Sequence, residues 1–176
     1  MIALLLRGAS FRTGERYNTS YNQKSDMQLV SLRALRQIYP LEDMYFCTNY
    51  TPFFHLLDEF HPVKKISTCL GKTQALTLLN AIRLIPTNAK YKTILCMRFD
   101  LHLSAPVNHI PEGKDFAFLW KEKWPVHTKD PSSWWRTEHR VGDMIHSWKH
   151  NATKAWVCAL SQQNISPDNT HLHLAY

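Results

Sequence analysis

The chain has 176 residues, 44% of them hydrophobic and 20% charged, which predicts a single globular domain over 1–176 and excludes a disordered or fibrous protein. Lysine and arginine number 21 against 14 acidic residues, so the formal net charge is +7 and an anionic partner is expected. The basic residues are scattered, which favours a small phosphate ligand over a nucleic-acid track, although a basic surface without a ligand would look the same.

The apolar stretches and the cysteines indicate the compartment. No apolar stretch approaches the roughly 20 residues that span a bilayer. The run Ile2–Leu6 is too short for a signal peptide and has no basic region before it. Cys47 and Cys96 fall in apolar, strand-like runs, which is typical of reduced, buried thiols, and no Cys-x-x-Cys pair is present. We therefore expect a cytoplasmic protein without a membrane span.

The first 100 residues alternate between strand and helix patterns. The continuous apolar run Ile2–Leu6 predicts a central strand buried on both faces. Apolar residues at helical spacing predict an amphipathic helix from Met27 to Ile38. Similar patterns predict further strands over 43–48, 63–68 and 93–98 and helices over 52–60 and 73–85. This order predicts an α/β fold with a largely parallel central sheet flanked by helices.

The pattern changes after Asp100. A further strand is predicted over 115–120 and a last helix over 151–163, and the intervening stretch 124–140 is rich in Trp, Lys, His and Pro with little periodicity. We interpret 1–103 as a nucleotide-binding half of the domain and 104–176 as a half that faces the substrate.

Charged residues follow the predicted strand 93–98. Asp100 and His102 would point to the same side of an extended chain, as suits a divalent metal. Asp100 could instead pair with Arg98 or cap the next turn. His171 and His173 form a second same-side pair, which would complete the metal site or simply lie on the surface. Imidazoles favour Mn²⁺ over Mg²⁺.

The loop after the first strand contains two arginines, a glycine and a hydroxyl group. These residues could grip a diphosphate or a nucleobase, or they could form a structural loop with solvated arginines. They are Arg7, Gly8, Ser10 and Arg12.

Two carboxylates and a tryptophan pair are further candidates for the chemistry. Asp143 follows a glycine, and a carboxylate half-buried at this position could act as a general base; it could instead cap a helix. Glu122 is the second choice of base, or a solvated residue at a strand end. Trp134 and Trp135 would stack on a sugar or a base, or fill the core.

An ordered set of short motifs resembles a known family. The set comprises Leu4–Arg12, Tyr45–Pro52, Met97–His102, Leu119–Glu122, Val141–His146 and His171–Tyr176. It is similar to the small GT-A-type glycosyltransferase domains of large algal DNA viruses, such as the N-terminal domain of the chlorovirus multidomain glycosyltransferase. The resemblance covers nearly the whole chain.

The resemblance implies a GT-A-like fold and transfer of a sugar from a UDP- or GDP-sugar to a glycan hydroxyl, assisted by Mn²⁺ or Mg²⁺. The family's metal-binding Asp-x-Asp corresponds to Asp100 and, with histidine replacing the second aspartate, His102. A late histidine, His171 or His173, is implied as a further ligand. The implied nucleotide-binding residues are Arg7, Gly8, Ser10, Arg12 and Arg98, with Thr48 and Tyr50 near the base.

Three other functions fit the same residues. The +7 charge and many aromatics would suit a protein that binds single-stranded nucleic acid. If the protein is a glycosyltransferase, we expect no nucleic-acid partner. The aspartate and histidines would suit a metal-dependent hydrolase. The histidine at position 102 would suit a degenerate transferase fold kept as a nucleotide- or sugar-binding module. If the protein is viral, the expected compartment is the host cytoplasm.

Overall fold

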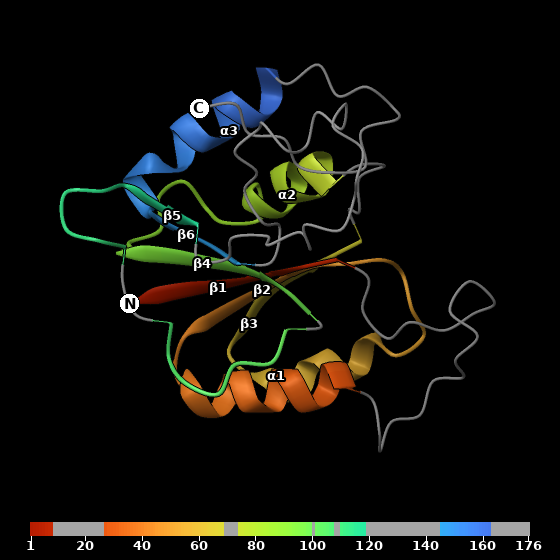
Figure 1. Ribbon diagram of the computed structural model, residues 1–176. Coiled ribbons are helices and arrows are strands. Elements are labelled where there is room, and N and C mark those ends of the chain that lie inside the picture. The colour runs from red at the N-terminus through yellow and green to blue at the C-terminus, as the bar shows by residue number, and fades with distance from the viewer. Residues whose placement is uncertain (9–26, 69–73, 100, 108–109, 119–144, 163–176) are drawn as a thin grey trace, which may run out of the picture.

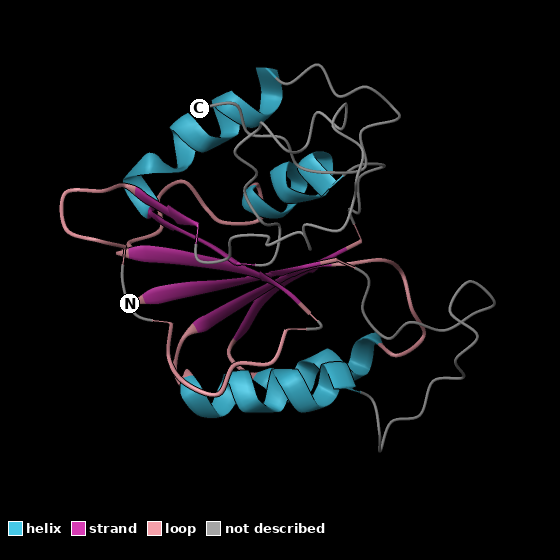
Figure 2. Cartoon of the chain, in the orientation of Figure 1, coloured by secondary structure: helices cyan, strands magenta, loops and turns pink. Residues whose placement is uncertain are grey.

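The computed structural model describes residues 1–8, 27–68, 74–99, 101–107, 110–118 and 145–162. These residues form a mixed α/β fold with a six-stranded sheet in the order β3-β2-β1-β4-β6-β5 and helices on both faces (Figure 1, Figure 2). The strands are β1 (Ile2–Arg7), β2 (Asp43–Cys47), β3 (Val63–Ser67), β4 (Thr93–Arg98), β5 (Phe116–Phe118) and β6 (Ile145–Lys149). The helices are α1 (Met27–Ile38), α2 (Gln74–Ile82) and α3 (Thr153–Gln162), with 3-10 helices η2 (Phe54–Phe60) and η4 (His150–Ala152).

The sheet is mixed, so the prediction of a largely parallel sheet was wrong. β1 runs parallel to β2 and β4, and β2 runs parallel to β3. β6, however, runs antiparallel to β4, and β5 runs antiparallel to β6. The sequence predicted no strand at β6, because this short segment contains His, Ser and Lys. An antiparallel neighbour needs no crossover helix, so the strand–helix alternation that signals parallel strands does not reveal it.

Each face of the sheet has its own apolar core, because successive strand residues point to opposite sides. On one face Leu6 packs with Leu32 of α1, and on the other Leu5 packs with Leu78 of α2 and Trp156 of α3. Figure 1 shows α1 below the sheet and α2 and α3 above it. β1 is buried on both faces, as its continuous apolar run predicted. Each fully buried leucine stabilises the fold by about 1.5–3 kcal/mol.

The helix predicted over 52–60 is instead the 3-10 helix η2, which begins at Phe54. Thr51 precedes this 3-10 helix. Its Oγ1 accepts a hydrogen bond from the N–H of Phe53 at 3.3 Å, so the hydroxyl stabilises the turn that precedes η2.

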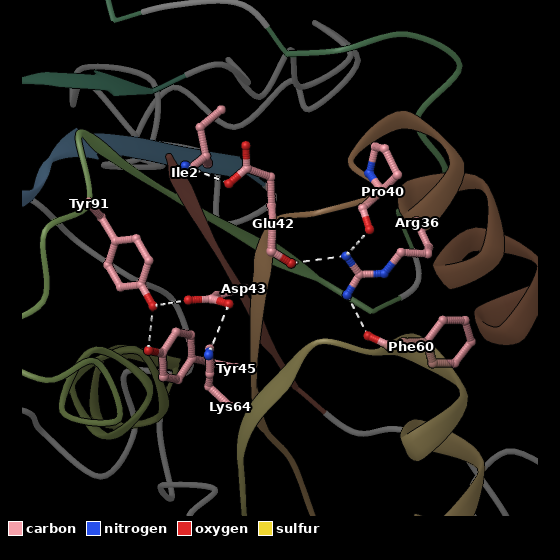
Figure 3. A network of polar contacts seen from close by, with 9 residues as sticks. All are labelled: Ile2, Arg36, Pro40, Glu42, Asp43, Tyr45, Phe60, Lys64 and Tyr91. Carbon is pink, nitrogen blue, oxygen red and sulfur yellow. Dashed lines mark hydrogen bonds and ion pairs between the residues drawn. The ribbon is translucent and has the colours of Figure 1, made fainter.

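A polar network lies at the edge of the sheet where the parallel strands begin (Figure 3). The hydroxyl of Tyr91 donates a 2.5 Å hydrogen bond to the carboxylate of Asp43 and shares a 2.8 Å hydrogen bond with the hydroxyl of Tyr45. Lys64 Nζ lies 3.5 Å from the same carboxylate. Burial, followed by the hydrogen bond to Asp43, raises the pKa of Tyr91 far above its usual value. The network joins β2 and β3 to the residues that precede β4.

A second group of polar contacts joins the end of α1 to the same edge (Figure 3). The guanidinium of Arg36 donates to the carbonyl oxygens of Tyr39 and Glu42, each at 2.9 Å, and to that of Phe60. The carboxylate of Glu42 accepts a 2.7 Å hydrogen bond from the N–H of Ile2. One arginine thus binds carbonyl groups after α1, before β2 and at the end of η2, and it holds these three segments together.

Candidate functional site

The direction in which the chain crosses the sheet changes beside β1. From β1 the chain passes through α1 to β2 and then to β3, and it returns through α2 to β4 on the other side of β1. The helices that follow β1 and β3 therefore cover opposite faces (Figure 1). In open α/β sheets, ligands bind outside the carboxyl ends of the strands at such a switch point. The carboxyl ends of β1 and β4 are therefore the first place to expect a site.

Two arginines end these strands side by side. Arg7 is the last residue of β1, Arg98 is the last residue of β4, and the two are register partners. Both lie on the face of Leu5 and Cys96, which α2 and α3 cover. Arg7 is 3% exposed and Arg98 is half-buried. Two neighbouring guanidiniums can hold a diphosphate by several directed hydrogen bonds.

The cysteines beside Arg7 are not suited to nucleophilic chemistry. Burial raises the pKa of the Cys96 thiol to about 11, although the charge and hydrogen bond of Arg7 act in the opposite direction. The thiol is therefore protonated at neutral pH. Cys47 and Cys96 are buried thiols outside any disulfide, as predicted, whereas Cys158 is exposed on α3. Cys69 lies outside the described residues.

Gly8 turns the chain away from the sheet directly after Arg7. Its N–H still donates to the carbonyl of Cys47 at 3.1 Å, so the backbone remains attached to β2. Its φ is +113°, a conformation that residues with a side chain rarely adopt. A Cβ added here would meet no atom within 4 Å, so the glycine is required by the backbone conformation rather than by space.

Thr48 and Tyr50 follow β2, the neighbour of β1. Thr48 is fully buried, its N–H donates to Ser67 at 2.9 Å, and its hydroxyl donates to the side chain of Asn49 at 3.1 Å. Tyr50 is 77% exposed, and its ring meets the ring of Phe54 edge-on with centroids 5.7 Å apart. Thr48 thus fixes the turn, while Tyr50 presents an aromatic face to solvent.

The chain turns again immediately after β4. Phe99 is buried, and its ring stacks on Phe46 with centroids 5.7 Å apart. The N–H of Leu101 donates to the carbonyl of Arg98 at 3.4 Å, and His102 is exposed just beyond. Within the described ranges, no three His, Cys, Asp or Glu side chains come together as a group that could hold a metal ion.

The structure therefore gathers part of the predicted site at one edge of the sheet. Arg7, Gly8 and Arg98 lie at the ends of β1 and β4, and Thr48 and Tyr50 follow the adjacent strand. The other predicted residues except His102 lie outside the described residues: Ser10, Arg12, Asp100, Glu122, Trp134, Trp135, Asp143, His171 and His173.

His146 is a further basic residue near this edge, and the sequence suggested no role for it. It is 1% exposed in β6, and its Cα is the register partner of Cys96. It therefore shares a face with Arg7 and Arg98, and its ring meets Trp156 edge-on with centroids 6.2 Å apart. The sequence did contain one indication of this: His146 and Trp148 are two residues apart, so their side chains would lie on the same side of a strand.

Comparison of the chain with protein-family models and with curated proteins gave no match. The GT-A relationship therefore stays a prediction that rests on the motifs. Within the part of the chain that the structure describes, no helix has both the length and the apolar character needed to cross a membrane.

Proposed function

We propose that the protein is a glycosyltransferase that moves a sugar from a UDP- or GDP-sugar to a hydroxyl group of a glycan. The observation that carries the proposal is the pair Arg7 and Arg98, which lies at the switch point between β1 and β4 beside Gly8. The resemblance of the motifs to GT-A-type domains supports the same chemistry. A GT-A-like architecture, with a donor half over 1–103 and an acceptor half over 104–176, is part of the proposal.

The donor would bind through its diphosphate and its base. Arg7 and Arg98 would form charge-assisted hydrogen bonds to the phosphate oxygens, and the turn at Gly8 would let the backbone approach them. Ser10 and Arg12 would extend this contact. The exposed ring of Tyr50 would stack on the base, with Thr48 holding the turn in place.

A divalent cation would assist the leaving group. Its proposed ligands are Asp100 and His102, with His171 or His173. One carboxylate with imidazoles is a donor set that fits Mn²⁺ better than Mg²⁺, which prefers oxygen ligands. His102 is exposed just beyond β4, where it is open to a ligand. When bound, the ion would supply positive charge to the diphosphate.

The acceptor chemistry would come from the second half of the chain. Asp143, or Glu122 as second choice, would take the proton of the acceptor hydroxyl, and Trp134 and Trp135 would stack on a sugar ring. As the acceptor oxygen bonds to the anomeric carbon, the bond to the diphosphate oxygen breaks. Arg7 would stabilise the charge that develops there.

A cytoplasmic location is also part of the proposal. Reduced thiols are the rule in that compartment, and Cys47 and Cys96 are buried cysteines outside any disulfide.

Isothermal titration calorimetry with UDP and with GDP, each with and without Mn²⁺, tests the donor site. We expect saturable binding that Arg98→Ala weakens about 10- to 100-fold, since a hydrogen bond to a charged group contributes about 1.5–3 kcal/mol. Arg83→Ala is the matched control, because Arg83 is an exposed arginine that directly follows α2, away from the strand ends. If neither nucleotide binds, or if both variants behave alike, the donor site is wrong.

A transfer assay separates an active enzyme from its alternatives. Release of UDP or GDP from the nucleotide sugar should require an acceptor and should be lost in Asp143→Asn. Nucleotide binding without any transfer would identify a binding module with a degenerate transferase fold. Release of sugar with no acceptor present would identify a hydrolase. Steeply salt-dependent binding to single-stranded nucleic acid, indifferent to metal, would replace the proposal altogether.

A further inference from the structure

We propose that the protein has a second ligand site, at the opposite edge of the sheet, for a small organic anion with an apolar body. A pocket of about 440 Å³ lies where β1 and β4 begin and β6 ends. Its walls combine four aliphatic side chains with two lysines and a histidine. This volume falls in the range of about 300–1,000 Å³ that is usual for small-molecule sites.

The pocket is separate from the arginine pair. Thr93, which lines the pocket, is the first residue of β4, whereas Arg98 is the last. At about 3.3 Å per strand residue, the two residues are roughly 16 Å apart. Leu95 also lines the pocket, and it belongs to the core on the α1 face, whereas Arg7 and Arg98 lie on the opposite face. A ligand in this pocket would therefore not touch the proposed donor site.

The segment that follows β4 forms one wall of the pocket and is held in place by Tyr39. This segment runs back below the sheet on the side of α1 (Figure 1). The hydroxyl of Tyr39 accepts a 2.7 Å hydrogen bond from the N–H of Val107 and donates to its carbonyl at 3.3 Å. Val107 lines the pocket. Because Val107 is anchored to the residue that follows α1, its part of the wall is held in place before a ligand binds, which lowers the entropic cost of binding.

The apolar part of the ligand would lie against aliphatic side chains. Ile2, Leu95, Val107 and Ile110 contribute to the lining, and Leu95 is 2% exposed. These side chains offer no hydrogen bonds, so they favour a ring or an alkyl group over a sugar. Ser147 adds a hydroxyl from β6 close to Leu95, which is its register partner.

The charged part of the ligand would face the two lysines of the rim. Lys92 and Lys149 both line the pocket, and Lys149 makes an ion pair with Asp115 at 3.0 Å. The N–H of His150 donates to the carbonyl of Lys92 at 3.4 Å, which brings these two rim residues together. The ring of His150 rests edge-on against Tyr91, with centroids 6.0 Å apart. Among the residues that the structure describes, the pocket lining itself has two lysines and no acidic side chain, while the carboxylates of Asp115 and Glu42 lie beside it, so the lysines favour a carboxylate or phosphate head group.

Phenyl phosphate and phenylacetate, titrated into the ¹⁵N-labelled protein and followed by amide shifts, test the site with both head groups. We expect saturable shifts at the amides of Thr93, Ser147 and His150. Benzyl alcohol, which lacks the charge, should bind up to about fivefold more weakly, since an exposed ion pair contributes up to about 1 kcal/mol. Inorganic phosphate, which lacks the apolar body, should bind at least about fivefold more weakly, because burial of an aromatic ring contributes about 1.5–3 kcal/mol. Whichever of phenyl phosphate and phenylacetate binds with the higher affinity identifies the preferred head group. If inorganic phosphate binds as well as phenyl phosphate, the lysines attract any anion and the proposal fails.

Two variants and a control tie the shifts to the pocket. Lys92→Gln should weaken phenyl phosphate binding about fivefold. Lys90→Gln is the control and should leave the binding unchanged, because Lys90 is exposed nearby in the chain but does not line the pocket. Ile110→Trp should abolish binding by filling the pocket, while the thermal unfolding midpoint reports that the fold is retained. Equal affinities in all three variants, or shifts confined to the residues around Arg98, would overturn the second site.

Discussion

The hydroxyl of Tyr91 makes a sharp test of what holds the starting edge of the sheet together. Tyr91→Phe keeps the ring, which meets Tyr45 edge-on with centroids 6.2 Å apart, and removes only the oxygen. Two hydrogen bonds disappear with it, the 2.5 Å bond to the Asp43 carboxylate and the 2.8 Å bond shared with Tyr45 (Figure 3). The change therefore isolates the polar network from the packing around it.

The size of the effect follows from the groups that lose their partner. A hydrogen bond to a charged group contributes about 1.5–3 kcal/mol, and a buried polar group left without its partner costs about 1–3 kcal/mol. Tyr45 is 3% exposed, so its hydroxyl would be left in a buried position. Asp43 keeps Lys64 at 3.5 Å, but the Lys64 side chain is 51% exposed and compensates little. We expect Tyr91→Phe to lower the free energy of unfolding by about 2–4 kcal/mol.

Urea denaturation followed by circular dichroism measures this loss. With a slope of about 2 kcal/mol per molar urea, the midpoint should fall by about 1–2 M without a change in slope. Tyr50→Phe is the matched control, because Tyr50 is 77% exposed, and its free energy of unfolding should change by less than about 0.5 kcal/mol. If Tyr91→Phe is as stable as Tyr50→Phe, the network does not stabilise the fold and the reasoning is refuted.

The same variant has a pH signature. The pKa of Tyr91 is raised in the folded protein from a reference value of 10.0, first by burial and then by the hydrogen bond to Asp43. The folded state therefore retains a proton that the unfolded chain releases, so this contribution to stability is complete below pH 10 and is lost as the pH rises above it. Stability should fall more steeply above pH 10 in the wild-type protein than in Tyr91→Phe.

Two further predictions concern the edge where the parallel strands end. Gly8→Ala should lower the free energy of unfolding by about 1–3 kcal/mol in urea denaturation, because alanine is strained at a φ of +113° although space is available; no loss would contradict the backbone argument. Iodoacetamide at pH 8 should modify the exposed Cys158 rapidly and Cys96 only on unfolding, since Cys96 is buried and its pKa is about 11. Mass mapping of the labelled native protein measures the two rates. Equal rates would show that the carboxyl ends of β1 and β4 open in the folded protein.

Part of the candidate site could be predicted because it follows recognisable strands. Arg7 and Gly8 come after one buried apolar run and Arg98 ends another, and the carboxyl ends of parallel strands meet at one edge. The complete burial of Thr48 could not be predicted, because its side chain is polar and its N–H meets the carbonyl of Ser67 only when β3 lies beside β2. His146 was missed for a related reason, since its burial depends on a strand that pairs antiparallel with β4.

The sequence by itself determined most of the segments that become strands and helices, although it did not reveal β6. Continuous apolar runs predicted β1 and β4, and helical spacing predicted α1, because the period of apolar residues sets which side of an element can be buried. The tertiary structure decided which strands are neighbours, the antiparallel place of β6, the pairing of Arg7 with Arg98, and the contact of Tyr91 with Asp43, 48 positions earlier. The physical reason is that backbone N–H and C=O groups are the same in every strand, so local sequence does not specify their partner. Only the packing of helices on both faces selects one order of strands, and with it the residues that meet at each edge.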